Sequence, residues 1–556
     1  MNGVDTRQPS PLTATPQRFD IAILGSRLAG TMLAAILARH GLRVVIADHE
    51  GQPRYATGEA SIPYTSLIFE LIADRYGVPE IRNIARARDV FGTIAPTSGV
   101  KKNLGFLYHR DGESHDPREA LQFNVPSEHG ETHLFRQDID AYMLRTAVRY
   151  GAVLRSRRAD GDIDIGSEGV SVEGAHGETI RANYVVDVSG RDSPVANRFG
   201  LRQEAEGMET RSTTLATHAI GVKRFDDCVP HKLPGRWHEG TLHHVFADGW
   251  LGVVPFGNHG GSLNPLCSVT LNLRGEIDGA DTGDAQLERL LRRFPSLRDQ
   301  LGDMRRVREW DVQRPAQYRA IDTVGSRYCL LDEAAAGNDL LFSRKLSNTA
   351  ELVHAVAHRL LTAAPRGAYD SPELLAFDRV QTAIAGLSDR IAASAYTAFR
   401  DFELWNAYAR VWLLVSIAST ITTKKVYDRF VQTGDAGVFE AVDGVAEDGF
   451  WMPVFDGYKE LLNGAVTACR DVDAGTCTPS AAARRIFDAL ADADYVPPIY
   501  GFADPEDRVY HLSAAKKLKT LWWGMRAAPK GARRLVFYRS FRKKSSGTNG
   551  AATAGD

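Results

Sequence analysis

The sequence predicts an α/β fold: a Rossmann-like domain, an inserted antiparallel β-sheet that forms a substrate domain, and a C-terminal helical lobe. Residues 19–50 read FDIAILGSRLAGTMLAAILARHGLRVVIADHE, which is an apolar strand, a glycine turn, an Ala/Leu-rich helix and a second strand. We interpret His243 and His244 as part of a strand pair of the substrate sheet rather than as metal ligands, because no partner at ligand spacing accompanies them. From about residue 370 apolar residues recur every three or four positions, which is typical of amphipathic helices.

A chain of 556 residues with 44% hydrophobic residues exceeds what one core usually organises, so we expect two or three lobes. The changes of pattern along the chain predict where these lobes begin and end. They divide it into a disordered N-terminus (1–18), a nucleotide-binding domain (19–370) with the sheet interleaved at about 91–135 and 205–315, a helical lobe (371–510) and a partly disordered basic tail (511–556).

Charge and cysteine content exclude several classes of protein. The net charge is −2, with 67 basic and 69 acidic residues, which gives no argument for a nucleic-acid partner. The five cysteines are scattered without ligand spacing, so we expect neither a disulfide framework nor a metal site, and a reducing cytoplasm fits best. The N-terminus lacks a hydrophobic signal core. The most apolar run, 411–419, is about half of the roughly twenty residues that a membrane span needs.

The glycine turn predicts a dinucleotide site. The first glycine permits a tight turn, the helix N-terminus after it accepts phosphate, a later glycine lets the helix pack closely, and the acid that ends the second strand suits ribose hydroxyls. Arg27 stands where GxGxxG would have its middle glycine, so a plain α/β crossover without ligand is the alternative. The residues of this unit that we assign to cofactor binding are Gly25, Ser26, Ala29, Gly30 and Asp48.

Several further segments occur in a specific order: GEASIPYTSLIFELIADRYGVPEI (58–81), SGVKKNLGFLYHR (98–110), DPREALQFNVP (116–126), GTLHHVFADGWLGVVPFGNH (240–259), NPLCSVTLNL (264–273) and LLFSRKLSNTAELVHAVAHRLL (340–361). Together they resemble flavin-dependent halogenases of the branch that acts on phenols and carrier-bound substrates, including the chloramphenicol-pathway type, within the two-domain flavin monooxygenase superfamily. The resemblance covers roughly residues 18–430.

This resemblance implies an enzyme that uses FAD, reduced by a separate flavin reductase, with oxygen and chloride to make hypohalous acid. Lys101, after the Ser-Gly-Val turn, matches the catalytic lysine of the family, whereas Lys102 falls at a variable neighbour. A desolvated amine either hydrogen-bonds hypohalous acid or forms a chloramine, whereas arginine keeps its charge and cannot serve as an amine nucleophile. The resemblance also assigns cofactor contacts to Glu59, Arg136, Asp187, Gly190, Asp332 and Glu333, and halide binding to Ser347 and Asn348.

Four positions depart from the pattern of the family. Arg27 replaces a glycine, Gly252 stands at the second tryptophan of a WxWxIP-like motif, and LLDEAA at 330–335 replaces Gly-Asp-Ala-Ala. The fourth departure is Lys345 in place of a glycine. Its side chain either attracts chloride or takes the space of halide and flavin, and both alternatives remain open.

No acidic residue lies between Asp507 and Asp556, while 516–544 carries eleven Lys or Arg and a Trp-Trp pair. Such a segment suits an anionic membrane surface or an acyl carrier protein, and a solvated tail is the alternative. We therefore predict a flavin-dependent halogenase of secondary metabolism, such as antibiotic biosynthesis, acting on an aromatic or carrier-tethered substrate. The alternatives are a flavin monooxygenase or oxidase, and a diverged homologue that serves as a carrier-protein or membrane partner.

Overall fold

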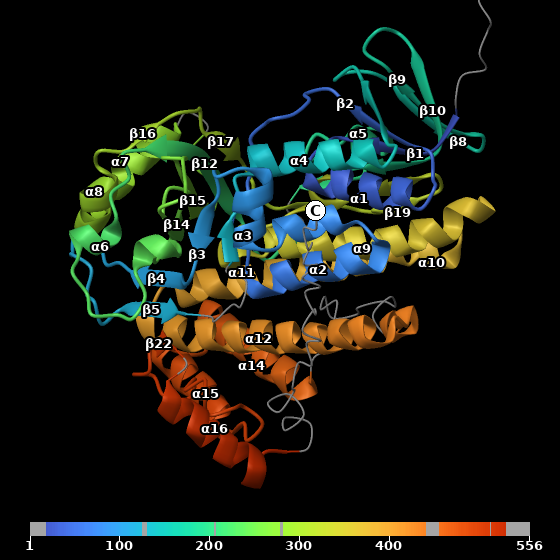
Figure 1. The fold of residues 1–556 in the computed structure, drawn as a ribbon. Helices are drawn as coiled ribbons and strands as arrows, with labels where there is room; N and C mark the ends of the chain where they lie inside the picture. The colour runs from blue at the N-terminus through green and yellow to red at the C-terminus, as the bar shows by residue number, and fades with distance from the viewer. Residues whose placement is uncertain are drawn as a thin grey trace, which may run out of the picture.

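The structure is a computed structural model that describes residues 18–124, 131–204, 207–278, 282–440, 455–511 and 513–529. Figure 1 shows a Rossmann-like sheet with its helices, a second sheet beside it, and long helices that lead to α14, α15 and α16 at the lower edge of the view. The predicted fold class is confirmed. The predicted N-terminal segment and most of the basic tail lie outside the described residues, and the predicted domain boundaries remain predictions.

The first sheet contains the expected strand–helix–strand unit. Its strand order is β19-β20-β10-β1-β2-β7, and β20, β10, β1, β2 and β7 run parallel. A hairpin, β8 and β9, extends it through antiparallel pairing of β9 with β10. The strands are β1 (Arg18–Leu24), β2 (Val44–Asp48), β7 (Val153–Ser156), β8 (Ile163–Gly166), β9 (Gly169–Glu173), β10 (Thr179–Asp187), β19 (Val324–Gly325) and β20 (Tyr328–Leu330).

Helix α1 (Leu28–Arg39) follows the glycine turn and buries Leu28 through Leu37. Its Ala- and Leu-rich sequence favours helix, and the chain leaves it through Gly41, whose φ of +86° is open to glycine. α1 contacts α4 (Arg136–Arg149) and α9 (Lys345–Ala363), so residues more than 300 positions apart in sequence form one core. This packing brings the start of α9 to the cofactor side of the fold.

The second sheet follows the order β16-β12-β15-β14-β13-β4-β5-β22, with β17 also paired to β12. Its pairings are antiparallel, except that β4 runs parallel to β13 and β22 runs parallel to β5, so the predicted antiparallel sheet is in detail mixed. The strands are β4 (Leu104–Tyr108), β5 (Ala120–Phe123), β12 (Ser212–Ile220), β13 (Thr241–Phe246), β14 (Gly249–Pro255), β15 (Cys267–Arg274), β16 (Arg305–Arg306), β17 (Asp311–Gln313) and β22 (Val509–Tyr510).

Shorter elements complete the two layers. β3 (Gly99–Lys101) pairs with β6 (Glu131–His133), and β18 (Tyr318–Ala320) pairs with both β11 (Arg202–Glu204) and β21 (Ala336–Gly337). The short helices are α3 (Ala87–Asp89), α5 (Pro194–Phe199), α6 (Phe225–Cys228), α7 (Gly283–Arg293), α8 (Pro295–Leu301) and α10 (Pro372–Leu375). α7 and α8 share a core cluster with the second sheet and so cover one of its faces.

The remaining helices are α2 (Pro63–Tyr76), α11 (Phe377–Ala398), α12 (Phe402–Thr433), α14 (Asp456–Asp473), α15 (Pro479–Asp492) and α16 (Ala514–Arg526). The long helix α12 contacts α2, α11, α14 and α15, and Figure 1 shows it running beneath α2. Its aromatic residues Trp405 and Trp412 are buried, as a core stripe predicts, although Trp412 also lines a cavity. In the described part of the chain no helix has the length and hydropathy to cross a membrane.

Candidate active site

The glycine turn between β1 and α1 has the backbone geometry of a phosphate-binding turn. Gly25 has a φ of +105°, and a Cβ on it would lie 3.1 Å from the Ser189 Cα. A Cβ on Gly30 would lie 2.6 Å from the Gly25 carbonyl oxygen. α1 begins without a side-chain cap, and Arg27 Nε is buried with no hydrogen-bond partner among the described residues. Close helix packing, an uncapped N-terminus and an unused cationic donor fit a dinucleotide pyrophosphate.

Asp48 ends β2 on the same side of the sheet and is 5% exposed. The Ser26 hydroxyl donates a hydrogen bond to its carboxylate, and Arg54 Nη1 lies 3.3 Å from it. Burial opposes ionisation of this group, but the bonds from Ser26 and Arg54 outweigh burial and lower the pKa of Asp48. Asp48 is therefore an ionised acceptor, as expected for a ribose-binding acid. Because the Ser26 hydroxyl is bonded to Asp48, only the backbone N–H of Ser26 remains to bind a phosphate.

Three of the departures from the family pattern form one ion network. Glu333 accepts hydrogen bonds from Lys345 Nζ and, at 3.0 Å, from Arg27 Nη1. Lys345 Nζ also donates to Thr57 Oγ1 at 2.7 Å, and its stem packs on Gly58, where a Cβ would come within 2.6 Å. Lys345 thus points into the site.

The neighbouring acid Asp332 also lies in this network. It is held by the Thr349 hydroxyl at 3.1 Å. Burial and the charge of Glu333 raise the pKa of Asp332, whereas Lys345 and Arg27 overcome burial and lower that of Glu333. Glu333 therefore has two counter-ions of its own beside the added carboxylate of Asp332.

Three other assigned residues have side chains that are engaged within the protein, and a fourth, Gly190, lies in a turn beside one of them. Arg136 is buried, pairs with Asp140 at 2.8 Å and donates to the Thr57 carbonyl at 2.9 Å, which fixes the loop beneath Lys345. Glu59 accepts a 2.9 Å hydrogen bond from the buried His218. The Asp187 carboxylate accepts hydrogen bonds from the Ser189 and Ser193 hydroxyls and from the Val195 N–H. Gly190, with a φ of +99°, lies in the same turn.

Lys101 ends β3 and points inward, whereas Lys102 points outward. The Lys101 side chain is buried, and its Nζ donates to Ser343 Oγ at 3.1 Å. Burial lowers the pKa of Lys101 to about 7, although the charge of Glu131 opposes this shift. Lys102 is 60% exposed and pairs with Glu239 at 3.0 Å. The expected difference between the two lysines is consistent with successive side chains of extended chain pointing to opposite sides, since Lys102 directly follows the last residue of β3.

Glu131 is a candidate site residue that the sequence did not reveal. It lies opposite Lys101 in the antiparallel pairing of β3 with β6, is 5% exposed and accepts a 2.5 Å hydrogen bond from Ser66 Oγ. An acid and a base of matched position in one cavity are suited to proton transfer. No periodicity in the sequence marks Glu131, because its partnership with Lys101 depends on the register of two short strands.

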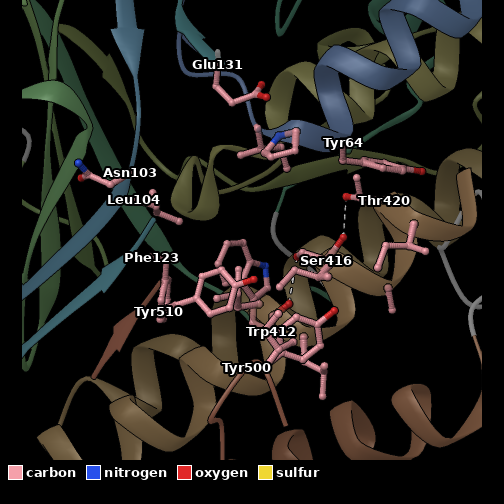
Figure 2. Close-up of a pocket in the computed structure, with 18 of the residues that line it drawn as sticks. Tyr64, Asn103, Leu104, Phe123, Glu131, Trp412, Ser416, Thr420, Tyr500 and Tyr510 are labelled. Atoms are coloured by element: carbon pink, nitrogen blue, oxygen red, sulfur yellow. Dashed lines mark hydrogen bonds between the residues drawn. The ribbon is translucent and has the colours of Figure 1, made fainter. Parts of the chain in front are cut away.

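Two cavities meet near Lys101. Lys101 and Glu131 line one of them, which has a volume of about 400 Å³ and which we call the larger cavity. Figure 2 shows Glu131 on one side of it and Tyr500, Tyr510 and Trp412 together on the opposite side. The walls are mainly apolar and aromatic, with a few hydroxyl and amide groups. Its other lining residues include Tyr64, Asn103, Leu104, Phe123, Leu413, Ser416, Ile417, Thr420, Ile421, Tyr458, Ile499 and Thr520.

The smaller cavity, of about 50 Å³, lies on the cofactor side and is lined by Ser343, Lys345, Thr57 and Gly58, among others. Because Lys101 lines the larger cavity and bonds Ser343, this hydrogen bond lies at the partition between the two. Phe342 and Ser343 have φ values of +69° and +56°, which non-glycine residues adopt at a cost of about 1–3 kcal/mol each. Strained backbone thus aims Ser343 at Lys101.

The two predicted halide residues lie in the first turns of α9, next to this strained turn. The Ser347 hydroxyl donates to the Arg344 carbonyl at 2.8 Å. The Asn348 side chain accepts from Arg344 at 3.2 Å and donates to Ser388 at 3.0 Å. Both side chains are engaged, so a halide here would have to meet backbone N–H groups of the helix start.

The arrangement defines a flavoprotein with a separate aromatic cavity behind a buried lysine, and the comparisons agree. The FAD binding domain family model matches residues 18–319. The chain is 38% identical over 513 residues to tetracycline 7-halogenase of Kitasatospora aureofaciens (91% of this chain, 92% of that protein). It is 36% identical over 534 residues to monodechloroaminopyrrolnitrin halogenase PrnC of Pseudomonas fluorescens (94% of each chain).

Among solved structures, halogenase PltM in complex with phloroglucinol and FAD aligns with a TM-score of 0.84 and 27% identity, covering 88% of this chain and 99% of that one. The chain therefore belongs to the flavin-dependent halogenase family. It is an FAD-dependent halogenase, as the order of its sequence segments predicts. The monooxygenase and silent-partner alternatives are not needed to explain it.

Proposed function

We propose that this halogenase chlorinates an electron-rich aromatic small molecule that binds free in the larger cavity. The observation that carries the proposal is the Lys101–Ser343 hydrogen bond, which lies between the strained turn on the cofactor side and an aromatic cavity of about 400 Å³. Aromatic walls with few polar groups suit a planar ring, and hydroxyls such as those of Ser416 and Thr420 suit its substituents.

FAD would be held along the glycine turn and the ion network. Gly25, Ser26, Ala29 and Gly30 would meet the pyrophosphate and Asp48 the ribose, while Arg27 supplies a cation. Arg136, Asp187 and Gly190 would position the backbone around the cofactor, with Glu59, Asp332 and Glu333 beside it. When bound and reduced, FAD would supply the two electrons that activate oxygen, and the activated oxygen would oxidise chloride to hypohalous acid. We infer a separate flavin reductase as the source of reduced FAD, as the family resemblance implies.

Chloride would bind at the start of α9, beside Ser347 and Asn348, through the N–H groups of the first helical turn, because the Asn348 N–H already donates to the Arg344 carbonyl at 2.9 Å. One feature supports this position: the strained turn at Ser343 leads directly into the helix N-terminus, where the helix dipole favours an anion. Because Lys345 is already paired with Glu333, its positive charge is largely neutralised within the network. Of the two alternatives for Lys345, we therefore do not favour the one in which it attracts chloride, and we propose that its charge neutralises Glu333 instead.

Lys101 and Glu131 would carry the halogen transfer. The ammonium of Lys101 hydrogen-bonds the oxygen of hypohalous acid. As the ring carbon attacks chlorine, the Cl–O bond breaks toward oxygen, and Lys101 gives that oxygen its proton so that water leaves. Glu131 then takes the proton from the chlorinated ring carbon and returns it to Lys101. A lysine with a pKa of about 7 can both give and regain a proton at neutral pH.

The relatives support a free aromatic substrate. Tetracycline 7-halogenase and PrnC match nearly the whole chain, and their names describe action on tetracycline and on monodechloroaminopyrrolnitrin. A chlorinase of a pyrrole on a peptidyl carrier protein matches with 24% identity over 59% of the chain. We therefore place this enzyme in antibiotic-type secondary metabolism, in the phenol-acting part of the branch. Its described cysteines are all free thiols, which supports the cytoplasm as the proposed location.

The test is a reconstituted reaction with purified protein, FAD, a flavin reductase, NADH, oxygen and chloride. A panel of free phenols, pyrroles and anilines is compared with the same rings tethered to a carrier protein. We expect products with the mass and isotope pattern of one added chlorine on free substrates only, and none without chloride. Chlorination restricted to tethered rings, or hydroxylated products, would contradict the proposal.

A further inference from the structure

Helix α16 is anchored by one side. Thr520 and Trp523 are buried, and Trp523 Nε1 donates to the Asp494 carbonyl at 3.2 Å. Lys516 pairs with Asp507 at 2.5 Å, and Ser513 caps the first turn. The helix is therefore fixed to the molecule at the lower edge of Figure 1, next to α15.

The opposite side of α16 carries four exposed apolar side chains. Leu518 is 70% exposed, Leu521 48%, Trp522 53% and Met525 65%. Their spacing of three and four residues gathers them on one stripe, which we call the outer face of α16. Single exposed leucines are ordinary on protein surfaces, but a contiguous stripe that includes a tryptophan marks an interaction site.

Cations flank the outer face on both sides. At about 100° per residue, Lys517 lies on one edge of the stripe, and Lys519 and Arg526 lie on the other. All three are exposed. The sequence that follows, 530–544, adds seven more Lys or Arg, and the next acid is Asp556. An apolar stripe bordered by cations is the pattern of a helix that lies in the interface of an anionic bilayer.

We propose that the outer face of α16 docks this halogenase on an anionic lipid surface. An acidic carrier protein would meet cations at the centre of a contact, where they can pair with carboxylates. Here the centre is apolar and the cations lie at its margins, which matches acyl chains beneath and lipid phosphates beside the helix. Thr520, on the inner side of the same helix, lines the larger cavity. Docking therefore places one wall of that cavity next to the lipid surface.

The test uses the full chain with sedimented vesicles of phosphatidylcholine alone or mixed with phosphatidylglycerol. We expect binding to the mixed vesicles that weakens as salt rises, because the lipid phosphates attract the flanking cations. The variant Leu518→Ser/Leu521→Ser/Met525→Ser keeps every charge and should lower binding by about tenfold or more. The control is Leu263→Ser, which removes a leucine that is 78% exposed on another part of the surface and should bind as the unaltered chain does.

Four outcomes overturn the proposal: no binding to mixed vesicles, equal binding by the triple variant, capture of an acidic acyl carrier protein in place of vesicles, or a dimer that the triple variant dissociates and that ignores vesicles. Circular dichroism and FAD content show whether the triple variant is folded. A folded triple variant that still binds would assign docking to the charges of 530–544 rather than to α16.

Discussion

Lys345 donates a hydrogen bond to the carboxylate of Glu333, and Arg27 holds the other oxygen of that carboxylate at 3.0 Å. In the sequence, each of these three residues departs from the pattern of the family. In the structure they form one network, in which two cations meet Glu333 beside the added acid Asp332. The charges of these departures therefore compensate one another, and we expect the lysine at the glycine position to act as the partner of Glu333.

The first prediction concerns this pair. Lys345→Gly should lower the free energy of unfolding by about 1–3 kcal/mol and weaken FAD binding, because Glu333 keeps only Arg27 while it lies beside Asp332. Thermal unfolding and fluorescence titration of FAD measure the two effects. The double variant Lys345→Gly/Glu333→Ala should recover part of both, since it removes the stranded carboxylate. A double variant no better than the single one would show that the pair is not coupled.

Residues 19–50 show what the sequence can predict. Strand and helix periodicity, a glycine turn and a terminal acid are local features, so the turn at Gly25 and the acid at Asp48 follow from spacing alone. The family resemblance identified Lys101 as the catalytic candidate, and the opposite directions of successive side chains then distinguish it from Lys102. Each of these predictions depends on residues that are close together in the sequence.

Glu131 and Lys345 show what the sequence cannot predict. Glu131 meets Lys101 only through the register of two three-residue strands separated by 29 residues. In the sequence, Lys345 and Glu333 each look like an unfavourable departure from the family pattern. Their mutual charge compensation cannot be predicted there, because it depends on side-chain rotamers and on the position of the loop at Thr57. β22 is similar: two residues at 509–510 join the sheet through tertiary contacts that no local pattern encodes.

The second prediction concerns Lys101 in catalysis. Lys101→Met should abolish chlorination while FAD affinity stays unchanged, because the ammonium acts in the larger cavity. Product formation and FAD titration are measured on the same preparation. Lys102→Met is the matched control and should retain turnover, since Lys102 is exposed and pairs only at the surface. Normal chlorination by Lys101→Met would remove it from the mechanism.

The third prediction follows from the pKa of Lys101. The folded chain holds this pKa at about 7, against an ordinary 10.5, so between these pH values the unfolded chain binds a proton that the folded chain lacks. Stability then rises with pH through this window. Lys101→Met lacks this contribution, so its melting temperature should exceed that of the unaltered chain most at pH 7 and converge with it toward pH 10. A difference that does not change with pH would mean that Lys101 titrates normally.

The fourth prediction concerns Glu131 as the base. Glu131→Gln keeps size and hydrogen bonding but cannot take a proton, so turnover should fall by about 10²–10⁴-fold. FAD affinity should not change, because Glu131 lies on the substrate side. Glu239→Gln, at the surface partner of Lys102, is the control and should keep full turnover. If Glu131→Gln remains as active as that control, the ring proton leaves by another route.

The last prediction tests the glycine turn as the cofactor site. A Cβ on Gly30 would lie 2.6 Å from both the Gly25 carbonyl oxygen and Val188 Cγ2, distances that packed atoms do not reach. Gly30→Ala should therefore push α1 from the turn, cost about 1–3 kcal/mol of stability and lower FAD affinity more than tenfold. Gly386→Ala is the control: it lies in α11, its Cβ would meet nothing within 4 Å, and helix propensity should stabilise it by up to about 1 kcal/mol. FAD titration at a temperature where both variants are folded separates lost affinity from lost stability. Undiminished affinity in Gly30→Ala would show that the pyrophosphate does not depend on this turn.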